Sequence, residues 1–148
     1  SQILFKIIEN YQQIPEMVGM FQKEVAERTA AVPRTKDYGI LSVLVQAYYD
    51  VKYLFTVHEN VFNPPPKVKS GVIKLTRNRK EGLEGNEIIF KQIVKTGFGQ
   101  RRKKLSNALK SLDIPEVLKS HAFMDKRAEE LSVEDFINFT KEWKAAKN

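Results

Sequence analysis

The chain has 148 residues, 42% of them hydrophobic and 29% charged, a composition typical of a folded globular protein. Its formal net charge of +7 favours a polyanionic partner, although many proteins without a nucleic-acid role carry a similar charge. The lack of cysteine excludes disulfides, thiolate zinc sites and thiolate catalysis. No apolar run approaches the ~20 residues that span a bilayer, and no signal-peptide pattern opens the sequence. We therefore expect a soluble, cytoplasmic protein with no membrane role.

The first part of the sequence is predicted to alternate between helices and strands. Its first helix is expected to start at residue 1 and to end near Asn10, as in a chain cut inside a larger domain. The further expected elements are a buried strand at 16–22, a helix at 24–31, a loop at 33–37, a helix at 38–49 and strands at 51–57 and 68–75. This order predicts the end of an α/β sheet that finishes in an antiparallel pair. Its open edge and apolar faces favour self-association or a partner.

Residues 61–80 form the most informative stretch, with six basic residues and no acidic one. Three consecutive prolines at 64–66 fix φ and remove three backbone donors, so they are predicted to form a stiff extended rod. Phe62, just before them, is then held in a fixed position beside a basic strand. A rigid aromatic ring next to lysines suits a site that grips a nucleobase. The alternative is that Phe62 packs under the sheet.

The composition changes at residues 79–86, where charged residues and two glycines indicate a linker. Beyond it the apolar spacing predicts only helices, near residues 88–94, at 105–112 and at 114–120, followed by a last helix. Ser132 and Asp135, three residues apart, resemble a capping box at the start of that last helix. The sequence therefore predicts two domains, a sheet-bearing domain at 1–78 and a small all-α domain at 79–148.

Four consecutive cations, Arg101, Arg102, Lys103 and Lys104, stand where the second of these helices is expected to begin. Cations at a helix N-terminus oppose the macrodipole by roughly 0.3–1 kcal/mol each, so some other interaction has to offset them. The exposed amides of a helix start bind phosphate, which makes this group a candidate anion clamp. The alternative is an ordinary solvated basic face.

Other candidate sites carry weaker patterns. His58 and His121 stand alone, without the spacing of metal ligands or a partner for general base catalysis, so no metal site is predicted. Gly97 and Gly99 lack the preceding strand that a glycine-rich phosphate loop requires.

Four blocks of sequence together resemble one enzyme family. They are FNPPPKV at 62–68 with Ser70, QKEVAER at 22–28, YGILSVLVQAYYDV at 38–51 and FGQRRKKLSNAL at 98–109. In these blocks the chain resembles the small-subunit ribosomal RNA adenine N6,N6-dimethyltransferases of the KsgA type. The resemblance implies an α/β fold, the C-terminal part of a Rossmann-like class I methyltransferase sheet, followed by a small all-α RNA-binding domain. It also implies dimethylation of two adjacent adenosines near the 3′ end of small-subunit rRNA, a step of ribosome biogenesis.

The cofactor implied by the resemblance is S-adenosylmethionine, bound by the full-length enzyme. SQILF, at 1–5, resembles the segment that directly follows the catalytic motif of the family. The family's glycine-rich cofactor loop, its ribose-binding acid and the catalytic motif itself all lie upstream of that segment. No cofactor-binding residue is therefore expected in this chain, and we expect the chain alone to be inactive.

The resemblance also assigns roles to particular residues. It implies that Phe62 stacks on the target adenine, and that Lys23, Arg28 and the four cations at 101–104 contact phosphates of the rRNA in the immature small ribosomal subunit.

Two other interpretations stay open. A non-enzymatic RNA-binding or ribosome assembly module fits the charge pattern equally well. A methyltransferase of the Erm type, which modifies large-subunit rRNA, shares the same ancestry, but the helical half with its FGQRRKKLSNAL block favours the small-subunit enzyme.

Overall fold

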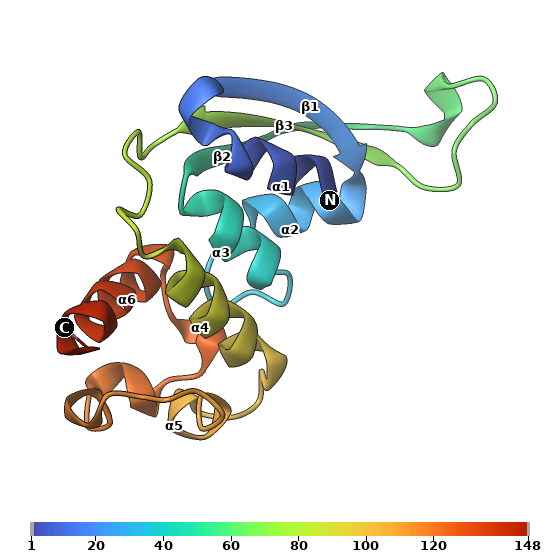
Figure 1. The fold of residues 1–148 in the computed structure, drawn as a ribbon. Helices are drawn as coiled ribbons and strands as arrows, with labels where there is room; N and C mark the ends of the chain where they lie inside the picture. Colours follow the sequence, from blue (N-terminus) through green and yellow to red (C-terminus); the bar gives the residue numbers. More distant parts are fainter. Residues whose placement is uncertain (1, 148) are drawn as a thin grey trace.

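The computed structural model describes residues 2–147 (Figure 1). Up to residue 77 its helices and strands are α1 (Gln2–Glu9), β1 (Glu16–Gln22), α2 (Lys23–Ala30), α3 (Ile40–Gln46), β2 (Tyr49–Val57) and β3 (Ser70–Arg77). Two short 3₁₀ helices, η1 (Tyr11–Gln13) and η2 (Glu59–Val61), lie between them. The predicted alternation of helices and strands is confirmed. Ser1, where the sequence predicts the first helix to begin, lies outside the described residues.

The three strands form one sheet in the order β1-β3-β2, and both neighbouring pairs are antiparallel. Strands β2 and β3 are the predicted antiparallel pair, and β1 lies along the other side of β3. Because β3 has a neighbour on each side, Val72, Ile73 and Leu75 are buried. The strand predicted at 68–75 begins two residues later, since its pairing with β1 stops at Gln22 and Ser70.

The helices of this part cover one face of the sheet (Figure 1). Helix α2 packs closely on β3, where a Cβ at Gly71 would lie 2.8 Å from the Cβ of Ala26 and 2.7 Å from the hydroxyl oxygen of Tyr53. Only glycine permits this approach without movement of the backbone. On the opposite face, away from the helices, the side chains of Val18 and Met20 are 56% and 50% exposed. The sheet therefore presents one uncovered, partly apolar face.

Helix α3 is shorter than the helix predicted at 38–49. It begins at Ile40, because the amide of Gly39 donates to the hydroxyl of Ser42 at 3.1 Å and caps the first turn. At the other end Tyr49 pairs with Arg77 and belongs to β2. An apolar run of this kind is buried equally well as a helix or as a strand, so the spacing of its residues does not locate the boundary.

The second part of the chain contains only helices in the region that the structure describes, as predicted. These are α4 (Glu87–Gly99), α5 (Leu105–Ala108), η3 (Glu116–Leu118), η4 (Ala122–Asp125), η5 (Ala128–Glu130) and α6 (Val133–Lys147). The predicted capping box of α6 is confirmed: the amide of Asp135 donates to the Ser132 hydroxyl at 3.1 Å, and the Ser132 amide donates to the Asp135 carboxylate at 3.0 Å. The helices enclose stacked aromatic rings, with the ring centroids of Phe123 and Phe139 3.9 Å apart.

One continuous hydrophobic cluster contains buried residues from both parts. Polar contacts join them as well: the amide of Arg34 donates to the carbonyl oxygen of Glu129 at 2.8 Å, and Arg79 pairs with Glu134. The division of the chain into domains between residues 78 and 79 stays a prediction. Among residues 2–147, no helix combines the length and the apolar character needed to cross a membrane.

Candidate functional site

Phe62 lies in the connection between β2 and β3, which projects away from the rest of the molecule (Figure 1). Its amide donates to the carbonyl oxygen of Glu59 at 3.3 Å, which places Phe62 at the end of η2. The side chain is half-buried but does not pack against the hydrophobic core, and residues 63–68 after it are exposed. The structure therefore does not have Phe62 under the sheet, the alternative that the sequence left open.

The segment after Phe62 bends at residues 62–64 and again at 67–68. Pro64 therefore lies in a bend, and the stiff extended rod predicted for the three prolines is limited to Pro65 and Pro66. The segment returns to the sheet beside α2, because the amide of Lys23 donates to the carbonyl oxygen of Lys69 at 2.9 Å. This hydrogen bond brings Lys23, predicted to contact phosphate, to the base of the connection that carries Phe62. Lys67, which follows the three prolines in the same connection, is exposed, and the sequence predicted no role for it.

Arg28 lies further along α2 and is exposed. Its guanidinium pairs with the carboxylate of Glu24 one turn earlier, as is usual for an i, i+4 pair. Its carbonyl oxygen accepts the hydroxyl of Ser42 and so fixes α2 against α3. A phosphate at Arg28 would therefore compete with Glu24.

An open groove runs from the start of α2 to the loop at residues 31–37. Its volume is about 450 Å³, and its lining includes Lys23, Thr35 and Tyr53. The far end of this groove is held by Arg101, whose guanidinium donates to the carbonyl oxygens of Thr35 and Lys36, both at 3.2 Å. Arg101 itself does not line the groove, and the carboxylates of Glu27 and Asp37 line it together with Lys23.

The four cations at 101–104 lie in the turn between α4 and α5, and α5 spans only residues 105–108. The predicted helix at 105–112 is therefore too long, but a helix does begin directly after the four cations, with Lys104 at its N-cap. Their role as an anion clamp stays a prediction. Arg101 is half-buried, with its guanidinium carbon 5.7 Å from the ring centroid of Phe98. Arg102, Lys103 and Lys104 are exposed. Only these three have side chains turned to solvent, while Arg101 braces the loop at 31–37.

Two further cations, which the sequence did not indicate as site residues, lie beside this group. The amide of Leu105 donates to the carbonyl oxygen of Lys126 at 2.8 Å, and Lys104 pairs with Arg127 in an isolated β-bridge. Lys126 and Arg127 are both exposed. In the sequence they do not stand out as a basic cluster, because Asp125 precedes them and Glu129 follows closely. Among residues 2–147, no three His, Asp or Glu side chains lie close enough to hold a metal ion.

Comparison with known proteins identifies the family. The sequence model of the ribosomal RNA adenine dimethylase family matches residues 1–145 of this chain. The chain belongs to this family, and the predicted resemblance is confirmed. Its relatives include the protein named ribosomal RNA small subunit methyltransferase A in Bacteroides thetaiotaomicron, which is 59% identical over 143 residues, and its namesake in Cytophaga hutchinsonii, which is 56% identical over 140 residues. These matches cover 95% of this chain but 53% and 54% of the relatives, so the chain spans about half of their length.

Solved structures share the fold. A dimethyladenosine transferase from Plasmodium falciparum matches with a TM-score of 0.86 and 23% identity, over 99% of this chain and 64% of that chain. The 23S rRNA methyltransferase ErmE matches with a TM-score of 0.58 and 20% identity, over 96% of this chain and 61% of that chain. At these identities the likeness concerns the fold alone, and it confirms the predicted α/β class.

Proposed function

We propose that this chain is part of an enzyme that uses S-adenosylmethionine to dimethylate two adjacent adenosines near the 3′ end of small-subunit rRNA in the immature subunit. Membership of the ribosomal RNA adenine dimethylase family and the names of the relatives support this proposal. The observation that carries it is the position of Phe62, an aromatic side chain outside the core on a projecting connection with basic neighbours.

Phe62 holds the target base in this proposal. Its ring has no role in the core, so a flipped adenine gains a stacking surface without disrupting the fold. A base–aromatic stack is worth roughly 1–3 kcal/mol, enough to change turnover by one to two orders of magnitude.

The basic residues hold the RNA backbone. Lys23 at the base of the Phe62 connection and Arg28 on α2 contact phosphates at one end, and the exposed cations at 102–104 contact phosphates at the other. Arg101 contributes charge while its guanidinium also holds the loop that lines the groove between them. Such contacts position the RNA and give affinity, but they do not read its sequence.

We assign no contact with the methyl donor to residues 2–147. Strand β1 runs directly into α2 at Lys23, without a glycine-rich turn, and β2 is followed by the Phe62 connection. In the turn between β3 and α4, Gly82 packs against the ring of Tyr11. Gly97 and Gly99, which the sequence analysis tested for this role, lie inside α4. Residues 2–147 therefore contribute base and phosphate contacts to the proposed enzyme.

The test is methylation of small-subunit rRNA by the complete protein that contains this chain. Phe62→Ala should lower the rate about 10- to 100-fold, while Phe62→Trp keeps much of it and Val61→Ala, a change at the exposed neighbour, leaves it unchanged. The melting temperature should stay the same in all three variants. A large fall in melting temperature for Phe62→Ala, with activity lost only in proportion to folded protein, would contradict the stacking role.

The same assay separates the alternatives. A complete protein that binds small-subunit RNA tightly but transfers no methyl group is a non-enzymatic RNA-binding module. Transfer to large-subunit RNA in place of small-subunit RNA identifies an enzyme of the Erm type.

A further inference from the structure

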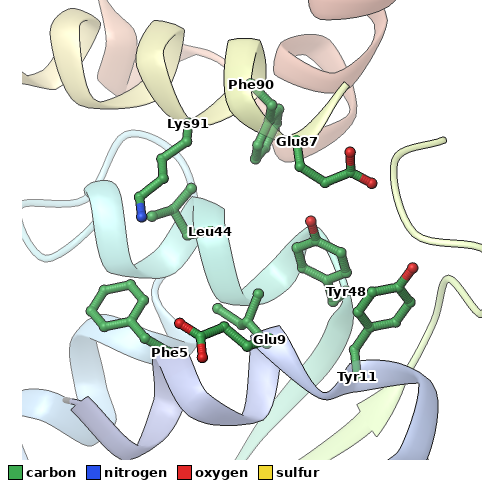
Figure 2. A pocket seen from close by; sticks show the side chains of 9 residues that line it. Phe5, Glu9, Tyr11, Leu44, Tyr48, Glu87, Phe90 and Lys91 are labelled. Carbon is green, nitrogen blue, oxygen red and sulfur yellow. The ribbon is translucent and has the colours of Figure 1, made fainter. Parts of the chain in front are cut away.

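A second cavity, remote from the Phe62 connection, lies where α1 and α3 meet α4 (Figure 2). Its volume is about 260 Å³, and four aromatic side chains form much of its wall: Phe5, Tyr11, Tyr48 and Phe90. The ring centroids of Tyr11 and Tyr48 are 4.9 Å apart and their planes are inclined by 39°. None of these residues belongs to the proposed RNA-binding surface.

The aromatic wall is fixed before any ligand arrives. Tyr48 and Phe90 are 6% and 2% exposed and belong to the hydrophobic core. Tyr11 packs against Gly82, where a Cβ would lie 2.3 Å from the tyrosine hydroxyl oxygen, and Gly82 has a φ of +65° that other residues rarely adopt. The segment between β3 and α4 is thus shaped to leave room for the Tyr11 ring.

Two carboxylates from different helices reach this cavity, Glu9 at the end of α1 and Glu87 at the start of α4, and Figure 2 shows them on opposite sides of the hollow. Among residues 2–147, the nearest cation to Glu9 is Lys6 on its own helix, at 3.9 Å, and Glu87 accepts only the amide of Gly85, at 3.3 Å. Lys91 also lines the cavity, but its ammonium lies within 4.0 Å of no carboxylate among residues 2–147.

We propose that this cavity binds an aliphatic organic cation, an ammonium or guanidinium group at the end of an alkyl chain. The faces of the two partly exposed rings, Phe5 and Tyr11, attract cations, while the buried rings of Tyr48 and Phe90 support them. The carboxylates of Glu9 and Glu87 add to this attraction and outweigh the single positive charge of Lys91. The apolar walls accommodate the alkyl chain. The cation comes either from a free polyamine or from a lysine or arginine side chain of a basic protein. This site is independent of the proposed methylation, and a ligand in it joins α1 and α3 to α4.

The test is a titration of the protein with spermidine and, separately, with N-acetyl-L-arginine amide, followed by the NMR signals of the tyrosine and phenylalanine rings at constant ionic strength. We expect saturable shifts at Phe5 and Tyr11, the two partly exposed rings of the cavity. Saturation by spermidine alone identifies a free polyamine as the ligand, and saturation by the arginine derivative alone identifies a protein side chain. The absence of saturable shifts with both probes overturns the proposal.

Variants show whether the charges act locally. Glu87→Gln and Glu9→Gln should each weaken binding about fivefold, and Tyr11→Leu about threefold, because each removes one attraction for the cation. Glu81→Gln removes an exposed carboxylate outside the cavity and should leave binding unchanged. Equal weakening by Glu81→Gln and Glu87→Gln would mean that only the overall charge matters, which overturns the site. Unchanged ring signals far from the cavity confirm that each variant is folded.

Discussion

The hydroxyl of Tyr38 donates to the carbonyl oxygen of Leu131 at 2.6 Å, a hydrogen bond between residues 93 positions apart. Tyr38 is fully buried, and its ring meets the ring of Phe98 edge to face with centroids 5.8 Å apart. Burial, followed by the charge of Asp135, raises the pKa of Tyr38 far above its usual value, so the hydroxyl remains a donor at every physiological pH. The segment before α3 is thereby tied to the segment before α6.

Removal of this hydroxyl should destabilise the protein. Tyr38→Phe keeps the ring but leaves the buried carbonyl of Leu131 without its donor, which costs about 1–3 kcal/mol. For a chain of this size, thermal denaturation should show a fall in melting temperature of roughly 2–4 °C per kcal/mol. Tyr53→Phe is the control, since its hydroxyl bonds only to Thr56 at the surface and should cost less. Equal melting temperatures for Tyr38→Phe and the parent protein would contradict this account.

Much of the fold could be predicted because the deciding interactions are local. The strand at 16–22 and the pairing of Ser132 with Asp135 are visible in neighbouring residues, and both are confirmed. The expected burial of this strand is wrong: β1 lies at the edge of the sheet, and its residues alternate between exposed and half-buried. The end of α3 could not be located, since Tyr49 joins the sheet through pairing with Arg77, which is distant in the sequence. The helix predicted at 105–112 does begin at Leu105, but it ends at Ala108, which the apolar spacing did not show.

The candidate site was harder to predict than the fold. Residue type identified Phe62 and the cations at 101–104 as candidates, and their assigned roles stay predictions. The sequence could not show that the guanidinium of Arg101 turns inward to the carbonyls of Thr35 and Lys36, because this contact joins segments more than sixty residues apart. Nor could it show Lys126 and Arg127 next to this group, since that proximity arises only when the chain folds back.

Arg101 and Arg102 should respond differently to replacement by alanine. Arg102→Ala removes an exposed charge, so it should lower the salt slope of binding to structured RNA by about 0.7–0.9 per lost phosphate contact and leave stability unchanged. Arg101→Ala should in addition cost about 1 kcal/mol of stability, because it removes both hydrogen bonds to the loop at 31–37. Filter binding over a range of salt concentrations and thermal denaturation measure the two effects. Unchanged RNA binding in both variants would identify an ordinary solvated face.

The uncovered face of the sheet should make this chain self-associate. Val18, Met20 and Phe55 on β1 and β2 are half exposed or more, and β1 pairs on one side only among the described residues. Met20→Lys places a charge in this face and should shift sedimentation towards the monomer. Ser106→Lys adds the same charge at an exposed position of α5 and should not. A parent chain that stays monomeric at high concentration would contradict this prediction.

Glu130 should give the protein part of its stability at neutral pH. The amide of Arg127 donates to its carboxylate at 3.1 Å, and the guanidinium of Arg34 lies 3.5 Å away. These groups, the backbone hydrogen bond first, lower the pKa of Glu130 below its usual value of 4.5. A carboxyl group whose pKa is lower in the folded protein than in the unfolded chain stabilises the fold above the unfolded pKa, and this contribution is lost as the pH falls through the folded pKa.

Glu130→Ala should therefore lower stability at pH 7, and the difference from the parent protein should shrink as the pH falls below about 4.5, where the parent carboxylate takes up its proton. Urea denaturation at a series of pH values measures this difference. Glu129→Ala is the matched control, since the Glu129 side chain makes no ion pair or hydrogen bond within residues 2–147, and its effect should not vary with pH. A Glu130→Ala difference that stays constant between pH 7 and pH 3 would show that the lost contacts are independent of the carboxylate charge, and that Arg34 and the Arg127 amide do not hold it.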